Sequence, residues 1–385
     1  MKHWSSYLQK HSGKYINSRF PNNANADIIV VIPCYNEMKL IHTLQSIRNT
    51  NKPNANILVV VIINSAINAH HDILLQNRST FNEVERFAIL NNNVNLIYFS
   101  LLCENLPRKH AGVGLARKIG MDLAIDHFYS NNNSKGIIIS LDADCEVSEN
   151  FFTSIYDEFS RNEKLNATIH NFHHRVEDND KDIESAIRQY EMYLHYFSER
   201  LKYIGFPYYF HTIGSAFAVS ADAYVRVGGM GRQQGGEDFY FLQKIFPLGH
   251  INELYETYVF PMARFSDRVP FGTGPAIQKI LDEPDRKIKV YSQQSFFHLK
   301  SLFEIKDSFY KKNKSEISTL LFQLHPALQN FLTEINLIEI LSDCNNNCAN
   351  LNSYRKRFFH HFNSFKIIKY LNYVHPTPFS FERLN

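Results

Sequence analysis

GIIISLDADCE, residues 136–146, is the stretch that decides the fold. Its three consecutive isoleucines and Leu141 have the composition of a short strand that is buried on both faces. The strand runs into Asp142 and Asp144, two carboxylates at i and i+2 that leave the strand end on the same side. Like charges at that spacing are costly unless a cation neutralises them, and hard divalent cations prefer oxygen ligands. The stretch therefore predicts a metal site at the carboxyl end of a strand, with a pair of solvated turn residues as the alternative.

Strands and helices alternate on both sides of this stretch. Three apolar runs with strand composition precede it, DIIVVIPC, NILVVVII and NLIYFSLL, and stretches with helical periodicity separate them. This alternation predicts an α/β protein with a mainly parallel, doubly wound sheet flanked by helices. From about residue 271 the sequence becomes helical and lysine-rich. We expect three parts: an N-terminal polar segment (1–26), an α/β domain (27–270) and a helical C-terminal region (271–385).

Composition restricts the class of protein. The chain has 385 residues, of which 44% are hydrophobic and 21% are charged, as in a globular protein with a full core. A net charge of +3 is too small to favour nucleic acid as a partner. The five cysteines are an odd number and do not suggest a disulfide framework, so we expect free thiols.

The apolar runs bear on localisation. The first 15 residues, MKHWSSYLQKHSGKY, lack the apolar core of a signal peptide, and the longest apolar run, ILVVVII, fits a buried strand better than a membrane span. We therefore expect a cytoplasmic protein. Basic and aromatic residues at 355–359 leave peripheral contact with the inner face of a membrane open, although a buried amphipathic helix explains them better.

The segment PCYNE follows the first strand, at an edge of the sheet where a nucleotide could dock. Tyr35 could lie against a base, and Glu37 could accept a hydrogen bond from a ribose hydroxyl. The alternative is structural: Pro33 stops the strand, Asn36 caps the next helix and Glu37 stands in its first turn.

The segment GVGLARKIG begins with the glycine spacing of a dinucleotide fingerprint. Arg117 occupies the place of the third glycine, and a long loop separates the segment from the preceding strand, so we exclude a nicotinamide cofactor. Lys109 and Gly112 near a helix start still suit a diphosphate, because a cation and free backbone N–H groups converge there. Arg117 could reach the same anion or form an ion pair on the surface.

The segment GGEDF places Glu237 and Asp238 at a helix start after two glycines. Acidic residues at a helix N-terminus are ordinary partners of the helix dipole. In a catalytic interpretation, one carboxylate is a general base and the other accepts hydrogen bonds from substrate hydroxyls. Three histidines, at 170, 173 and 174, form a local cluster. We interpret them as exposed or capped side chains in preference to metal ligands.

The order of these motifs resembles that of the family 2 glycosyltransferases over residues 27–265. The resemblance implies the GT-A fold, a Rossmann-like, mainly parallel sheet flanked by helices, here with a helical C-terminal extension. It also implies a metal-dependent, hexosyltransferase-type enzyme of glycan or polysaccharide biosynthesis. Such an enzyme moves a sugar from a nucleotide-sugar to an acceptor hydroxyl with inversion. The acceptor would be a glycan, a lipid-linked molecule or a small molecule.

The resemblance also assigns roles to residues. Asp144 and Asp142 would hold Mn²⁺ or Mg²⁺ on the diphosphate of the donor, where the cation offsets the charge of the leaving group. The region matching PCYNE would line the nucleotide, which implies Pro33, Tyr35 and Glu37. Asp238 would be the base that deprotonates the acceptor hydroxyl, and Glu237 would orient the acceptor.

Two departures from the family pattern stand out. Many members carry an aspartate pair after the second strand that reads the base, and here Asn64 and Ser65 occupy that place, so the donor base is not assigned. Some members supply a late histidine as a further metal ligand. The corresponding segment here, FPMARFSDRVPFGTG, offers Arg264, Asp267 and Arg268 instead.

Three alternatives to an inverting transferase stay open. The first is a retaining transferase on the same fold. The second is a nucleotidyltransferase, for which the sequence shows neither a second carboxylate cluster nor a basic triphosphate loop. The third is a catalytically silent module that binds a nucleotide or a glycan. The intact carboxylates Asp142, Asp144, Glu237 and Asp238 favour an enzyme.

Overall fold

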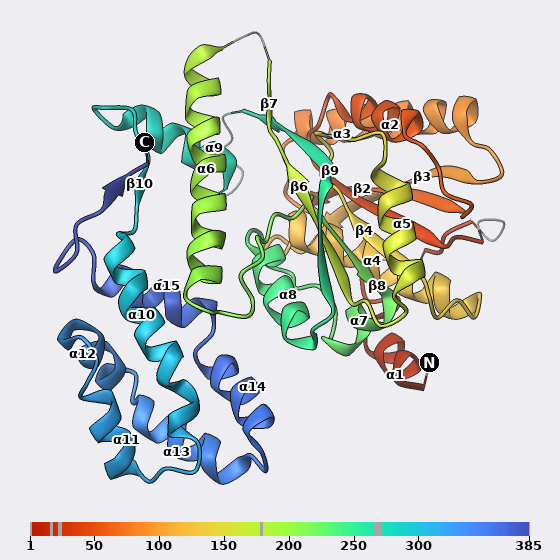
Figure 1. Ribbon diagram of the computed structural model, residues 1–385. Helices are drawn as coiled ribbons and strands as arrows, with labels where there is room; N and C mark the ends of the chain where they lie inside the picture. Colours follow the sequence, from red (N-terminus) through yellow and green to blue (C-terminus); the bar gives the residue numbers. More distant parts are fainter. Residues whose placement is uncertain (1, 16–17, 22–24, 178–179, 265–271, 385) are drawn as a thin grey trace. The chain divides into compact units, whose positions relative to one another are not determined.

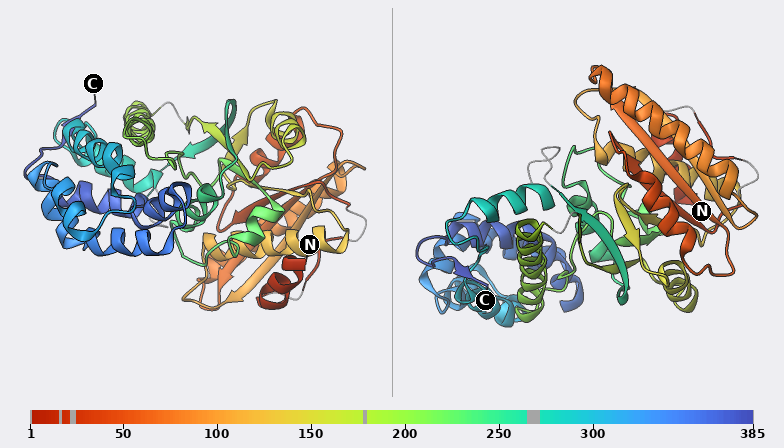
Figure 2. Two further views of the ribbon diagram at one scale, coloured as in Figure 1. Left: turned by 60° about the horizontal axis from the view of Figure 1, so that its bottom comes forward. Right: turned by 90° about the horizontal axis from the view of Figure 1, so that it is seen from above.

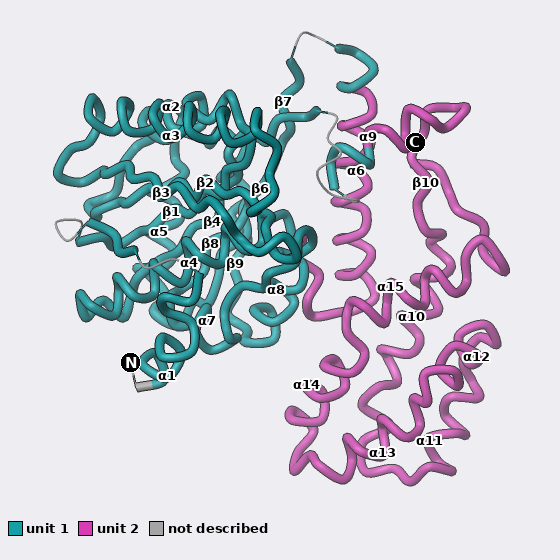
Figure 3. Tube along the Cα trace, turned by 180° about the vertical axis from the view of Figure 1, so that it is seen from behind, with its two compact units in different colours: residues 1–184, 212–276 teal, residues 185–211, 277–385 magenta. Residues whose placement is uncertain are grey.

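A computed structural model describes residues 2–15, 18–21, 25–177, 180–264 and 272–384 (Figure 1). The chain forms two compact units, which Figure 3 shows in different colours. The first, which we call the α/β unit, comprises residues 1–184 and 212–276, and the second, the helical unit, comprises 185–211 and 277–385. Helices α6 (Lys181–Tyr203) and α9 (Thr273–Asp282) each begin in the α/β unit and end in the helical unit.

The α/β unit is built on one large mixed sheet. In the described part of the chain its order is β3-β2-β1-β4-β8-β6-β9-β5, with β7 paired to β9. The strands are β1 (Ile28–Cys34), β2 (Ile57–Ala66), β3 (Leu96–Leu106), β4 (Ile137–Ser140), β5 (Cys145–Val147), β6 (Ala167–Phe172), β7 (Arg175–Val176), β8 (Phe217–Ser220) and β9 (Ile251–Ala263). Strands β3, β2, β1 and β4 are parallel, β8 is antiparallel to β4 and β6, and β9 is parallel to β6 and β7 but antiparallel to β5.

Helices cover both faces of this sheet (Figures 1 and 2). Helices α2 and α3 lie on one face, and α4 lies on the other, against β1, β2 and β4. The helices and the one 3-10 turn described in this unit are α1 (Lys2–His11), α2 (Leu40–Asn49), α3 (His71–Asn91), α4 (Val113–Ser130), α5 (Phe151–Arg161), α7 (Ala221–Arg226), α8 (Glu237–Ile245) and η1 (Phe246–Leu248).

The central strands form the core because their β-branched residues are buried on both faces. Every residue of β1 and β4 is buried, as is all of β2 except its last residue. Helix α4 lies close to them, since a Cβ atom added at Gly120 would come within 2.4 Å of Val31 Cγ1. The composition of these strands therefore determines which part of the chain becomes the centre of the sheet.

The N-terminal segment, which looks polar in sequence, contains helix α1. Trp4, Tyr7 and Leu8 are buried, and the Tyr7 hydroxyl donates a hydrogen bond of 2.6 Å to Asp122 Oδ1 on α4. Lys118 also pairs with Asp122, at 2.8 Å. The helix is thus fixed by a few apolar side chains and one buried polar network, a signal too short for periodicity to show.

The helical unit has its own hydrophobic core. In its described part, apart from the ends of α6 and α9, the elements are β10 (Lys289–Val290), α10 (Gln293–Ile305), η2 (Lys306–Phe309), α11 (Lys314–Leu321), α12 (Pro326–Glu334), α13 (Leu337–Asn347), α14 (Leu351–His361), α15 (Ser364–Tyr373) and β11 (Glu382–Arg383). Phe358 and Phe359 on α14 are buried, which confirms the amphipathic helix expected there.

The predicted fold class is confirmed: a mainly parallel sheet is flanked by helices and a helical C-terminal region follows. All five cysteines are free, as expected. Among the helices of the described residues, none combines the length and the apolar character needed to cross a bilayer. The predicted part boundaries at residues 26 and 270 stay predictions.

Candidate active site

The predicted site residues of the PCYNE and DAD motifs lie at the carboxyl ends of two central parallel strands, β1 and β4. Strand β1 pairs in parallel with both β2 and β4, so the chain leaves all three strands at the same edge of the sheet. Pro33 is buried within β1, Tyr35 is half-buried just beyond it, and Asp142 and Asp144 follow β4. The topology therefore brings the PCYNE and DAD motifs to one edge, as expected for a ligand site in an α/β sheet.

A buried arginine joins two of the motifs. Arg117, in the first turns of α4, donates a hydrogen bond from Nη2 to Asp142 Oδ1 and another from Nη1 to Glu237 Oε1. The side chains of Arg117 and Glu237 are each only 2% exposed, whereas that of Asp142 is 35% exposed. We call Arg117, Asp142, Glu237 and Asp238 the buried cluster. Its geometry rules out the surface ion pair considered for Arg117.

The backbone before β8 completes the buried cluster. A Cβ atom added at Gly214 would lie 2.8 Å from both Arg117 Nη2 and Asp238 Oδ2. Only glycine leaves room for the guanidinium and the carboxylate to lie on that side of the chain. Gly214 was not singled out from the sequence, because a glycine that precedes a short strand carries no signal of this contact.

The charges within the buried cluster are unequal, with three carboxylates around one guanidinium. Burial raises the pKa of Glu237 to about 7, and it also raises the pKa of Asp238, while Arg117 opposes both shifts. Although burial alone would lower it, the neighbouring carboxylates raise the pKa of Arg117. Arg117 is therefore a permanent cation, and at least one carboxyl group of the pair can hold or accept a proton near neutral pH.

The glycines of GVGLAR allow α4 to pack closely against the segment that carries Glu237. A Cβ atom at Gly114 would come within 2.2 Å of the Gln233 carbonyl oxygen and 3.0 Å of Glu237 Cβ. Gln234 also donates hydrogen bonds of 3.0 Å to two carbonyl groups of the preceding loop, at 108 and 111. The start of α4 is thus held against the segment that carries Glu237. Lys109 in that loop is exposed, and Gly112 is the N-cap of α4.

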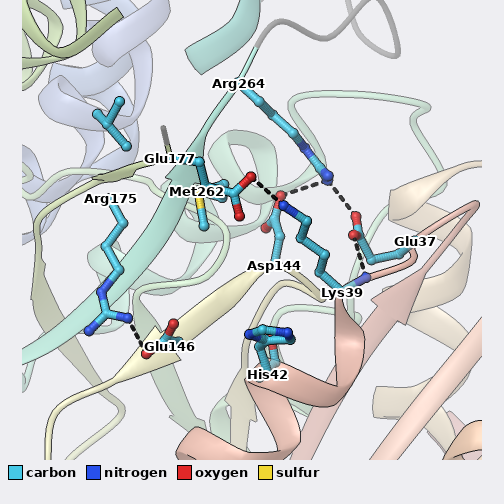
Figure 4. A pocket seen from close by; sticks show the side chains of 11 residues that line it. Glu37, Lys39, His42, Asp144, Glu146, Arg175, Glu177, Met262 and Arg264 are labelled. Atoms are coloured by element: carbon cyan, nitrogen blue, oxygen red, sulfur yellow. Dashed lines mark hydrogen bonds and ion pairs between the residues drawn. The ribbon is translucent and has the colours of Figure 1, made fainter. Parts of the chain in front are cut away.

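A second arginine lies on the other side of the DAD motif. Arg264, directly after β9, donates hydrogen bonds from Nη2 to Glu37 Oε2 (2.5 Å) and Asp144 Oδ2 (2.8 Å) (Figure 4). We call Glu37, Asp144 and Arg264 the pocket cluster, because they line a pocket of about 250 Å³. Two further ion pairs stand in this pocket, Lys39 with Glu177 and Arg175 with Glu146, as Figure 4 shows. The two DAD aspartates therefore have different arginine partners.

Helix α3 holds the PCYNE loop in place. The Asn36 backbone N–H donates to Asn77 Oδ1 at 2.9 Å, and the Thr80 hydroxyl donates to the Glu37 carbonyl oxygen at 3.0 Å. Asn36 has a positive φ of 48°, a conformation that asparagine tolerates better than most residues. Helix α2 begins at Leu40 with Lys39 as its N-cap, so the structural alternative that made Asn36 the cap is wrong.

Asn64 and Ser65 are buried at the end of β2. The Asn64 carbonyl oxygen accepts a hydrogen bond of 3.0 Å from Asn77, the same residue that holds the PCYNE loop. The end of β2 and the PCYNE loop are therefore linked by one side chain.

The donor atoms of the pocket cluster fit a metal ion that is shared with a substrate. The Glu37 and Asp144 carboxylates already accept hydrogen bonds from one guanidinium nitrogen, so a single cation can bind both. In the described residues no group of three or more His, Cys, Asp or Glu side chains could hold a metal ion. Magnesium commonly binds to one or two carboxylates and completes its shell with water and substrate phosphates. A metal bound to Asp144 and completed by a diphosphate fits these residues, and a cage made of protein ligands alone does not.

Two of the three histidines interpreted as exposed or capped are buried. His170 is buried on β6, where its Nε2 lies 3.0 Å from Thr168 Oγ1, and His174 is buried with its Nε2 3.2 Å from Thr273 Oγ1. His173 is exposed. Of the segment that follows β9, Asp267 and Arg268 lie outside the described residues.

Comparisons with known proteins identify only distant structural similarity. Neither the family models nor the curated proteins include a match to this chain. Among solved structures, S. aureus TarS 1–349 in complex with UDP-GlcNAc is 12% identical with a TM-score of 0.42, covering 87% of this chain and 92% of that chain. S. aureus TarS 1–349 in complex with UDP is 11% identical with a TM-score of 0.39, covering 87% and 91%. Because both TM-scores are below 0.5, we base the function on this chain's own residues.

Proposed function

We propose that this chain is a metal-dependent glycosyltransferase of family 2 with the GT-A fold. It would transfer a sugar, with inversion, from a nucleotide-sugar to the hydroxyl of a glycan, lipid-linked or small-molecule acceptor. The observation that carries the proposal is the pair of contacts made by Arg117. This one side chain joins an aspartate of the DAD motif to the glutamate of the GGED motif. These would be the donor-side and acceptor-side carboxylates, which direct displacement requires in a single site.

The donor would bind at the edge formed by β1 and β4, within the proposed catalytic domain 27–270. Tyr35 lies half-buried there and would contact the base, with Pro33 and Glu37 shaping the loop. Asp144, with Glu37 and Asp142, would hold Mn²⁺ or Mg²⁺, which when bound would offset the charge that develops on the diphosphate leaving group. Lys109 and the N-cap at Gly112 would add positive potential near the start of α4.

Asp238 would act as the general base. Its carboxylate takes the proton of the acceptor hydroxyl as the hydroxyl oxygen forms a bond to the anomeric carbon. The bond from that carbon to the diphosphate oxygen breaks, and the nucleoside diphosphate leaves with the electron pair. The pKa of Asp238, which burial raises, supports this role, because a more basic carboxylate takes up a proton more readily. Glu237, fixed by Arg117, would orient the acceptor.

A direct assay tests the proposal. Purified protein is incubated with a panel of nucleotide-sugars, Mn²⁺ and simple sugar acceptors, and the product is analysed by NMR. The expected result is a glycoside whose anomeric configuration is opposite to that of the donor, with one nucleoside diphosphate released per transfer. Retained configuration would overturn the inverting mechanism, and nucleotide binding without any transfer would identify a silent binding module.

A further inference from the structure

The pocket cluster contains a cation where a metal ion would be expected. A single nitrogen of Arg264, Nη2, lies 2.5 Å from Glu37 Oε2 and 2.8 Å from Asp144 Oδ2. The Arg264 side chain is 34% exposed and the Asp144 side chain 23%, whereas the Glu37 side chain is only 3% exposed. The guanidinium, the most exposed of the three groups, therefore neutralises two carboxylates that are less accessible to water; Figure 4 shows its contacts with both.

A guanidinium and a divalent cation cannot occupy the same position between these carboxylates. Each neutralises the like charges, and each needs the oxygen atoms that the other uses. A metal ion that binds Asp144 at this position must therefore displace Arg264. The displaced side chain then loses two charge-assisted hydrogen bonds, which weakens the binding of the metal by the free energy of those contacts.

We propose that Arg264 is an internal counter-ion that competes with the divalent metal for Asp144 and Glu37, and that the donor's diphosphate relieves the competition by giving the guanidinium another anionic partner. Metal and diphosphate would then bind cooperatively, each raising the affinity of the other by the same factor. This inference rests on the proposed function, because it assumes that Asp144 holds a metal next to a diphosphate.

A second arginine that lines the same pocket, Arg175, provides a matched control for Arg264. Arg175, on β7, pairs with Glu146 across the same pocket and makes no contact with Asp144 or Glu37 that the structure describes. Its side chain is 49% exposed, compared with 34% for Arg264, so it is the more accessible of the two. Removing the charge of Arg175 changes the net charge of the pocket by the same amount and leaves the pocket cluster intact.

The test measures binding of Mn²⁺ by the electron paramagnetic resonance signal of free Mn²⁺, with and without inorganic pyrophosphate as a probe that carries no base or sugar. Four proteins are compared: wild type, Arg264→Gln, Arg264→Lys and Arg175→Gln. Circular dichroism and thermal unfolding confirm that each variant is folded. Because Mn²⁺ binds pyrophosphate in solution equally in all samples, differences between the proteins report on the site.

Without pyrophosphate, Arg264→Gln should bind Mn²⁺ about tenfold more tightly than wild type, since the Arg264 guanidinium no longer has to be displaced. Arg264→Lys, which keeps a cation, should stay near wild type, and Arg175→Gln should change the affinity by less than about twofold. Pyrophosphate should raise the Mn²⁺ affinity of wild type by a larger factor than that of Arg264→Gln. The proposed competition is contradicted if Arg264→Gln binds Mn²⁺ no more tightly than wild type. It is also contradicted if Arg175→Gln gains as much Mn²⁺ affinity as Arg264→Gln does.

The outcome can be separated from that of the proposed function. If sugar transfer occurs but the Mn²⁺ affinity of Arg264→Gln is unchanged, Arg264 is not the counter-ion and the transferase stands. If the affinities change as expected but no nucleotide-sugar is turned over, the metal site stands and the proposed reaction is wrong.

Discussion

The buried cluster and the pocket cluster both pair an arginine with carboxylates, but in different surroundings. In each, one guanidinium forms ion pairs with two carboxylates, one of which is an aspartate of the DAD motif. In the buried cluster the arginine is 2% exposed, and in the pocket cluster it is 34% exposed. A guanidinium without access to water cannot exchange its carboxylate partners for water or a ligand, so the buried cluster is a fixed part of the fold. The pocket cluster borders a cavity and can exchange its cation for a ligand.

The largest effect should come from Asp238 in the buried cluster. Asp238→Asn removes the proposed base but keeps the size of the side chain, so we expect turnover to fall about 10³-fold while nucleotide binding is retained. Steady-state kinetics and a thermal-shift assay with nucleoside diphosphates would measure the two properties. Near-normal turnover would show that Asp238 is not the base.

Stability should separate the two arginines. Arg117→Gln leaves carboxylates uncompensated in a buried site and should lower the free energy of unfolding by about 3–5 kcal/mol. Arg264→Gln breaks a partly exposed contact and should cost about 1 kcal/mol or less. Urea unfolding of both variants provides the comparison, and equal losses would contradict the distinction between a fixed and an exchangeable cation.

Donor binding should depend on the pocket cluster. Asp144→Ala removes the proposed metal ligand, so nucleoside diphosphate should bind about tenfold more weakly than to wild type when Mn²⁺ is present, and equally well when it is absent. Isothermal titration with and without Mn²⁺ tests this. An affinity that is the same for both proteins in both conditions would remove Asp144 from the metal site.

The smallest effect should be a pH dependence that originates in the buried cluster. Burial raises the pKa of Glu237 from 4.5 to about 7, so the folded protein holds this proton more tightly than the unfolded chain does. The resulting stabilisation is present below pH 4.5 and is lost as the pH rises to about 7. Glu237→Gln should therefore show a flatter decline of unfolding free energy over this range in urea titrations at several pH values. An identical decline in both proteins would show that Glu237 is not the group that titrates.

The sequence predicted the strands and the motifs better than it predicted their contacts. Three consecutive isoleucines are enough to identify β4, because strand composition is a local property. The contact between Arg117 and Glu237 joins residues far apart in the chain, and Arg264 reaches Glu37 across a still longer separation. Such pairs depend on how α4 and β9 pack, which no spacing within a motif reveals. Helix α1 was missed for the same reason, since its burial depends on α4.

The measurement that tests the central claim most directly is a thermal-shift screen of nucleoside diphosphates and nucleotide-sugars, each with and without Mn²⁺ or Mg²⁺. A ligand that binds only the folded state raises the unfolding temperature. The account predicts a shift with one nucleotide that is larger with the metal than without it, and that loses this dependence on the metal in Asp144→Ala. A folded protein whose unfolding temperature is unchanged by every nucleotide, with or without metal, would contradict it.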